Sequence, residues 1–164
     1  MSASGNYPAD KLAVRSYEWG PVLDLATREV FEMMLGTPLE GGIETEPPKV
    51  PDITAMVSLA GEFSGIVSVR CQAASACRMA AKMLHVEEVS FDQYAKDALG
   101  EVCNMVAGNF KTKVSGVVGS CLLSVPTVIT GSDYYVHHLM DGGHIHVFLS
   151  FEGHPLWVAL DITG

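Results

Sequence analysis

The order of helix-like and strand-like segments is the feature that most limits the folds open to this chain. Segments rich in β-branched, leucine and aromatic residues occur in two blocks, at 53–70 and at 121–162. Short stretches containing glycine separate the two segments of the first block and the last two segments of the second block, so we expect these neighbours to pair antiparallel. Helical patterns lie before the first block and between the two. This arrangement predicts an α+β fold, with helices packed on a mainly antiparallel β-sheet.

The expected order is helix, two strands, two helices, three strands. Apolar residues recur at helical spacing from 16 to 35, which predicts a helix that begins near Trp19 with Pro21 in its first turn. Residues 36–52 hold four prolines and three glycines and are expected to form an irregular connector. Residues 53–70 then read as a β-hairpin with a glycine-containing turn.

Two helices and three strands are expected after the hairpin. The alanine-rich segment 73–84 predicts a short helix, and residues 90–113 predict a longer one. Ser90 is its expected N-cap, with Gln93 three residues later as in a capping box. The final strands are expected at 121–130, 144–152 and 155–162.

The charge balance argues against several kinds of partner. The chain has 164 residues, with 10 Lys and Arg against 19 Asp and Glu, and a net charge of −9. So few basic residues predict no nucleic-acid partner and no binding to anionic membranes. No apolar stretch approaches the roughly 20 residues of a membrane-spanning helix, and no signal-peptide pattern is present. We therefore expect one cytoplasmic domain over residues 1–164, with 1–10 as a flexible leader.

Motifs for metal binding and covalent catalysis are missing. The four cysteines are widely spaced among apolar residues, which predicts reduced, buried thiols. His144 and His146 would share one face of a strand, but no third ligand stands at a recognisable spacing, so we predict no metal site. The chain contains neither G-x-S-x-G nor G-x-x-x-x-G-K-[ST], which argues against a serine hydrolase, an ATPase or a kinase.

The segment 97–111, DALGEVCNMVAGNFK, carries two stripes when it is placed on a helix. The expected core-facing stripe comprises Ala95, Ala98, Leu99, Val102, Met105, Val106 and Phe110. The second stripe, which we call the motif ridge, comprises Asp97, Glu101, Asn104 and Gly108, at i, i+4, i+7 and i+11.

A solvated polar face is the simplest interpretation of the motif ridge, but two of its residues fit it poorly. The side chain of Asn104 competes with the backbone of a helix for hydrogen bonds. Gly108 costs about 1 kcal/mol relative to alanine at such a position. These two residues favour a ridge on which another protein docks.

The pattern Asp97-x-x-x-Glu101-x-x-Asn104, followed 22 positions later by Pro126, resembles the signature of the CheC/CheX/FliY family of chemotaxis phosphatases. A single copy of the pattern makes the chain look like CheX, whose members usually act as dimers. The resemblance implies that the chain is a homodimeric hydrolase. It would remove the phosphoryl group from the aspartyl phosphate of a response regulator of the CheY type.

The resemblance also implies a role for each matching residue. Asn104 would orient the attacking water, because a carboxamide can accept from water and donate to a phosphoryl oxygen without adding negative charge. Glu101 would pair with a cation of the partner, Asp97 would be peripheral, and Pro126 would be structural. The helical spacing adds Gly108, as space for a loop of the partner. No cofactor is expected from this chain, since the regulator would supply its own Mg²⁺.

Two other classes of function remain open on the sequence. The chain could be a non-catalytic module of the same fold that docks a receiver domain or a flagellar-switch component. It could also be a structural oligomerisation domain, with the motif ridge as plain solvated surface. The presence of both Glu101 and Asn104 favours catalysis, because an adaptor has no need of a carboxamide beside a carboxylate.

Overall fold

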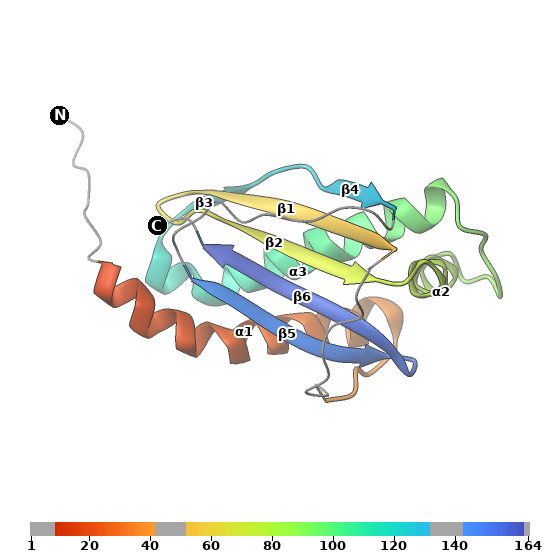
Figure 1. Cartoon of the computed structure of the whole chain (residues 1–164), viewed down its shortest axis with the longest axis horizontal. Helices are drawn as coiled ribbons and strands as arrows, with labels where there is room; N and C mark the ends of the chain where they lie inside the picture. Colours follow the sequence, from red (N-terminus) through yellow and green to blue (C-terminus); the bar gives the residue numbers. More distant parts are fainter. Residues whose placement is uncertain (1–8, 42–51, 132–142, 163–164) are drawn as a thin grey trace.

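The structure, a computed structural model, describes residues 9–41, 52–131 and 143–162. Three helices pack on an antiparallel sheet in this part of the chain, which confirms the predicted fold class (Figure 1). The helices are α1 (Ala9–Leu35), α2 (Ala73–Leu84) and α3 (Gln93–Val118). The strands are β1 (Ile53–Gly61), β2 (Gly65–Cys71), β3 (Cys121–Leu123), β4 (Thr127–Thr130), β5 (His144–Phe151) and β6 (His154–Ile162).

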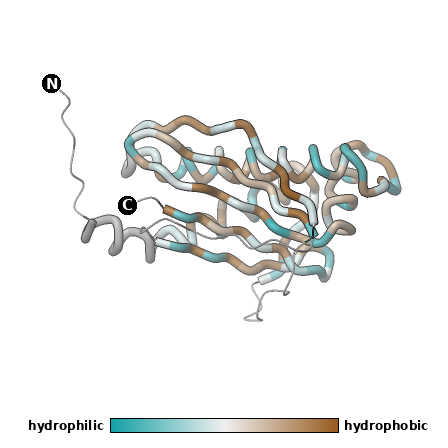
Figure 2. Tube along the Cα trace, turned by 45° about the horizontal axis from the view of Figure 1, so that its top comes forward, coloured by the Kyte–Doolittle hydropathy of each residue, from teal (hydrophilic) through white to brown (hydrophobic). Residues whose placement is uncertain are grey.

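The sheet has the strand order β3-β1-β2-β6-β5, and β4 pairs with β1 on the same edge as β3. Both predicted hairpins, β1–β2 and β5–β6, are present and antiparallel. The first hairpin pairs Ile53 with Cys71, and the second pairs Phe151 with His154. Hydrophobic and hydrophilic segments follow one another along the strands (Figure 2), as expected for a sheet with two different faces.

The core lies between the sheet and the helices. α1 covers β5 and β6, and α3 covers β1 and β2 and contacts both other helices. Trp19 of α1 meets Phe63 and Phe110 edge-on, with ring centroids 5.1 and 6.1 Å away, so it joins α1, the β1–β2 turn and α3. The Cys103 thiol of α3 lies 3.5 Å from the Ala55 carbonyl oxygen and 3.6 Å from that of Val67, and donates to both strands. Burial raises the pKa of this thiol to about 12.

The first helix is longer than the sequence predicts. It begins at Ala9 rather than near Trp19, so the last two residues of the expected leader are helical, and Pro21 lies inside the helix. Proline in a helix interior removes one backbone hydrogen bond and normally destabilises it. Here Leu23 and Phe31, both fully buried, pack the following turns onto the core. Tertiary packing therefore outweighs the local penalty of the proline.

The third helix also differs at its ends. Its N-cap is Asp92 rather than Ser90, because the Asp92 carboxylate accepts a hydrogen bond from the backbone N–H of Tyr94, at 2.9 Å. The helix continues to Val118, five residues beyond the predicted end. Residues 97–108, which carry the motif ridge, lie inside both sets of bounds.

The strand predicted at 121–130 is divided into β3 and β4. β3 pairs Leu59 with Leu123, whereas β4 pairs Met56 with Thr127, so the register shifts by one residue between them. Ser124 bonds the segment between β3 and β4 to β1. Its backbone N–H donates to the Ser58 carbonyl, and its hydroxyl accepts a hydrogen bond from the Ser58 N–H, each at 2.9 Å. Pro126, which has no N–H to donate, occupies the extra length as in a β-bulge.

Within the described ranges, no helix combines the length and hydropathy that a membrane span requires. The four cysteines are unpaired, and Cys77 is the only one of them that is partly exposed.

Replacing Leu99 by alanine tests the packing of α3. The side chain is fully buried, so Leu99→Ala leaves a cavity and should lower the free energy of unfolding by about 2–5 kcal/mol. Urea denaturation of the two proteins measures this difference. A loss below about 1 kcal/mol would show that α3 is not packed as described.

Candidate functional site

The inner face of α3 determines where the motif ridge points. Leu99, Val102, Val106 and Phe110 are fully buried against the sheet and α1. Met105, expected in this stripe, is only partly buried. Since the two stripes lie on different sides of one helix, burial of the first directs the second outward.

The four residues of the motif ridge differ in exposure. Asp97 and Glu101 are exposed, whereas Asn104 and Gly108 are half-buried. The Asp97 carboxylate accepts a hydrogen bond from the Gln93 side chain at 2.7 Å, one turn earlier on the helix. No described residue forms a hydrogen bond or an ion pair with the side chain of Glu101 or Asn104. One carboxylate and one carboxamide of the ridge are therefore not engaged by the described chain.

Pro126 lies against α3 at the level of the motif. A Cβ atom added to Gly100 would stand 3.5 Å from Cβ of Pro126 and 3.4 Å from Cγ2 of Val128. Gly100 directly precedes Glu101 and is one helical turn from Asn104, so the bulge supports the helix where these two side chains leave it. The sequence did not predict this contact. A buried glycine in mid-helix is the signal that could have revealed this contact.

Gly108 faces its own chain more than the sequence predicts. A Cβ atom added there would lie 3.8 Å from Cδ1 of Leu123 in β3, at ordinary packing distance. One turn further along the helix, the Thr112 hydroxyl donates a hydrogen bond to the Gly108 carbonyl at 3.0 Å. Leu123, at the edge of the sheet, therefore occupies part of the space next to Gly108.

A groove between α2 and α3, which the sequence did not predict, borders the motif ridge. It has a volume of about 240 Å³ and contains Asp97 and Glu101 from the ridge. The other residues that line this docking groove are Ala80, Met83, Leu84, Tyr94 and Ala98. Leu84 and Tyr94 are 48% and 61% exposed. Exposed apolar side chains next to carboxylates that form no ion pair are typical of a surface that meets another protein.

Polar contacts from α1 hold α3 in its rotational position. The Asn109 side-chain amide donates to the Ala26 carbonyl at 3.1 Å and to the Glu29 carboxylate at 2.8 Å. Glu29 also pairs with Lys113 at 2.9 Å. The hydrogen bonds from Asn109 and Lys113 lower the pKa of Glu29. These contacts resist rotation of α3 about its axis, which would move Asn104 away from its present direction.

The histidines considered as metal ligands lie on the sheet, away from the ridge. His144 Nδ1 is 2.5 Å from the buried Asp161 carboxylate, and His146 lies beside Phe148. Among the residues placed by the structure, no three His, Cys, Asp or Glu side chains gather closely enough to hold a metal ion.

Two substitutions of Gly100 test its contact with Pro126. Gly100→Ala adds a Cβ atom at ordinary contact distance and should leave stability unchanged or raise it by up to about 1 kcal/mol. Gly100→Leu adds atoms that the bulge has no room for and should cost about 1–3 kcal/mol. The free energy of unfolding in urea measures both. Equal stability of the two variants would contradict the packing of the bulge on α3.

The lowered pKa of Glu29 predicts how the stability of the fold depends on pH. A carboxylate with a depressed pKa in the folded state stabilises the fold above its unfolded pKa, about 4.3, and loses this effect as the pH falls. Glu29→Gln should therefore be less stable than the unaltered protein at about pH 6 and nearly equal to it at about pH 3. Unfolding in urea at both pH values measures the difference. Glu88→Gln, at an exposed carboxylate, is the control, and a Glu29→Gln difference that does not vary with pH would contradict this role.

Comparison with known proteins shows to which family the sequence belongs and which solved structures have the same fold. The sequence model of the family described as chemotaxis phosphatase CheX matches residues 53–150, which is more than half of the chain. No curated protein sequence matches the chain significantly.

Several solved structures share the fold. The chemotaxis protein CheX of Desulfovibrio desulfuricans is similar with a TM-score of 0.75 and 24% identity, over 88% of this chain and 99% of that one. CheX of Vibrio vulnificus has a TM-score of 0.76 and 18% identity, over 88% and 96% of the two chains. A CheX–CheY–BeF3–Mg²⁺ complex from Borrelia burgdorferi has a TM-score of 0.75 and 21% identity, over 89% and 98%.

Proposed function

Because the chain belongs to the CheX family of chemotaxis phosphatases, we propose that it dephosphorylates the aspartyl phosphate of a CheY-type response regulator. The observation that carries this proposal is the pair Glu101 and Asn104, held on a packed helix without a partner among the described residues. The similar structure from Borrelia burgdorferi, a complex of CheX with CheY, supports this class of partner. A cytoplasmic location is expected from such a partner.

The proposed reaction needs positioning more than covalent chemistry. An acyl phosphate is already reactive, and Mg²⁺ and a lysine of the regulator would bind the phosphoryl oxygens. What remains is to hold a water in line with the departing aspartate oxygen. This chain would therefore act without a cofactor of its own, while Mg²⁺ stays with the partner.

Asn104 would orient the attacking water. Its carboxamide oxygen can accept a hydrogen bond from the water, and its NH₂ group can donate to a phosphoryl oxygen. The side chain leaves α3 next to the contact between Gly100 and Pro126, which limits movement of the helix at that point. A group that is already oriented loses little entropy when the regulator docks, and this favours the transition state.

Glu101 and the docking groove would bind the regulator around its phosphorylation site. The Glu101 carboxylate would pair with the regulator's active-site lysine, which sets the register of the complex. Leu84 and Tyr94 would pack against an apolar part of the regulator beside that lysine. Asp97 would add negative charge at the rim, although Gln93 holds one of its oxygens.

We also propose that the chain acts as a homodimer. β5 is the last strand of the sheet, and among the described residues its outer edge pairs at the bridge between Glu40 and Ser150. A strand at the edge of a sheet can pair with another chain, and twofold dimers are the commonest closed assemblies.

Asn104→Ala tests the proposed role of the carboxamide. With a phosphorylated CheY-type receiver and Mg²⁺, the substitution should lower the rate of phosphoryl loss by at least about 10²-fold, because one oriented hydrogen-bonding group is lost from the transition state. Gln72→Ala is the matched control. It removes a side-chain amide that makes no cap hydrogen bond and lies outside the motif ridge and the docking groove, so the rate should not change.

The outcome of this assay also separates catalysis from docking alone. A receiver that binds the unaltered protein without faster phosphoryl loss would support a non-catalytic module. An Asn104→Ala variant as active as the unaltered protein would contradict the role of Asn104.

Glu101→Gln tests the ion pair with the regulator. Removing the charge should raise KM for the phosphorylated receiver by at least about tenfold, because the partner's cation loses its counter-charge in the interface. Glu88→Gln, which removes an exposed charge outside the groove lining, should leave KM unchanged. Unchanged KM and kcat for Glu101→Gln would make Glu101 a surface residue without a role in binding.

A further inference from the structure

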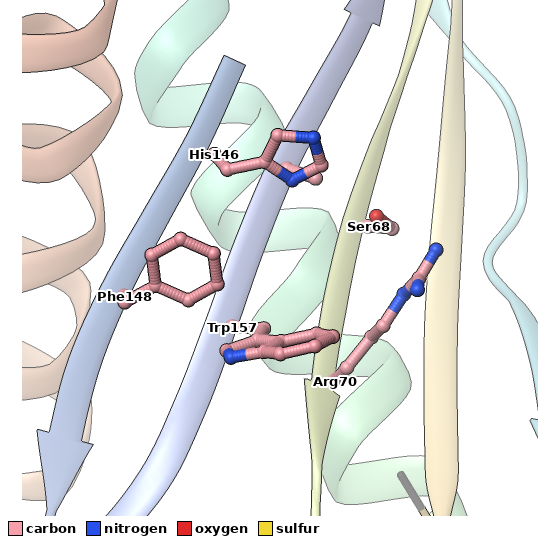
Figure 3. Close-up of a pocket in the computed structure, with 6 residues that line it drawn as sticks. Ser68, Arg70, His146, Phe148 and Trp157 are labelled. Carbon is pink, nitrogen blue, oxygen red and sulfur yellow. The ribbon is translucent and has the colours of Figure 1, made fainter. Parts of the chain in front are cut away.

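The face of the sheet turned away from α3 has a hollow of about 290 Å³ that the proposed phosphatase site does not use. Figure 3 looks onto this face, with α3 behind the strands. We call the hollow the open-face pocket. Its lining comes from the three neighbouring strands β2, β6 and β5 and consists of Ser68, Arg70, His146, Phe148, Trp157 and Ala159.

The register of the strands explains why a hollow forms here. The lining residues stand in two rows across the strands, one of Ser68, Ala159 and His146, and one of Arg70, Trp157 and Phe148. Opposed residues of antiparallel strands point to the same face. The small side chains of Ser68 and Ala159 therefore form the floor, while the large side chains around them form walls.

Two buried polar atoms in this pocket lack a partner. Ser68 is only 2% exposed, and its hydroxyl oxygen makes no hydrogen bond. The Nε atom of Arg70 is also buried without a hydrogen-bond partner. A buried donor that is left unsatisfied costs about 1–3 kcal/mol, so native proteins rarely keep two in one place. Both groups would be satisfied by a ligand that brings hydrogen-bond acceptors.

Arg70 also differs from the other arginines whose side chains the structure describes. Arg28 pairs with Asp24 at 2.7 Å, and Arg78 pairs with Glu152 at 3.0 Å. No described carboxylate pairs with Arg70, although the chain carries a net charge of −9. A partly buried guanidinium without a counter-charge favours an anion as the ligand.

The walls of the pocket indicate the shape of that anion. Phe148 and Trp157 meet edge to face, with ring centroids 5.3 Å apart, and His146 stacks on Phe148 at 6.2 Å. These rings offer flat apolar surfaces on which a planar group can pack. The volume lies near the lower end of the range for ligand pockets, which favours a small molecule.

From these observations we propose that the open-face pocket binds a small planar aromatic carboxylate. Its carboxylate would accept two hydrogen bonds from the Arg70 guanidinium and one from the Ser68 hydroxyl, and its ring would pack on Trp157 and Phe148. A phosphate group suits the pocket less, because the single positive charge of Arg70 does not balance a dianion. The next row of the sheet holds the Asp161 carboxylate, bonded to His144, which also favours a ligand of low charge.

Binding of two matched probes to the full chain tests this proposal. Indole-3-carboxylate and indole-3-carboxamide have the same ring and differ in the charge of one group. NMR titration should show the carboxylate binding with a Kd of about 1 mM or lower, and the carboxamide at least about tenfold more weakly. The shifted resonances should belong to β2, β5 and β6. No phosphatase activity enters this measurement, so its outcome is independent of the proposed reaction.

Three variants locate the binding. Arg70→Gln should weaken binding of the carboxylate by at least about tenfold, whereas Arg78→Gln, an arginine outside the pocket, should not change it. Ala159→Val narrows the floor and should weaken both probes equally. Thermal unfolding of each variant controls for loss of the fold.

Three outcomes would overturn the proposal. The first is no binding of the carboxylate up to about 10 mM, and the second is equal binding of both probes. The third concerns a carboxylate supplied by a second copy of this chain. If Arg70→Gln changes the sedimentation of the protein from dimer to monomer and the unaltered protein binds neither probe, the pocket is part of a subunit interface.

Discussion

Burial of one face of α3 against the sheet and α1 sets the orientation of the motif ridge. Leu99, Val102 and Phe110 are excluded from water by the sheet beneath and by α1 beside them. Each buried side chain of this size contributes about 1.5–3 kcal/mol, so the helix cannot rotate without losing several of these contributions. The opposite side of the helix must then face outward, and it carries Glu101 and Asn104. The core thus determines which way the proposed catalytic groups point.

Three further contacts hold α3 in this orientation. Asn109 bonds α3 to Ala26 and Glu29 of α1, and the Cys103 thiol bonds it to carbonyls of the sheet. The bulge at Pro126 contacts the helix at Gly100, one residue before Glu101. Because these contacts come from three directions, the motif ridge is supported along its length. A proposed mechanism based on orienting a water requires such support, since a small displacement of the amide would lose the alignment.

Much of this arrangement follows from local pattern. Short glycine turns predicted both hairpins, and the spacing from Leu99 to Phe110 predicted the buried stripe of α3. The sequence predictions failed at places where contacts between distant parts of the chain determine the structure. Packing keeps Pro21 inside α1, the one-residue register shift at Pro126 depends on pairing with β1, and the docking groove exists only because α2 lies beside α3. Of these three features, only the register shift has a signal within its own segment, because Pro126 cannot donate to a neighbouring strand.

The side-chain amide of Asn104 can be observed directly in a complex with the proposed partner. In NMR titration with a CheY-type receiver activated by BeF3 and Mg²⁺, we expect the NH₂ resonances of Asn104 to shift and to exchange more slowly with solvent, while those of Asn109 stay unchanged. An Asn104 amide that keeps its free resonance in a saturated complex would contradict the proposed role of Asn104, because the group proposed to reach the phosphoryl site would then not contact it.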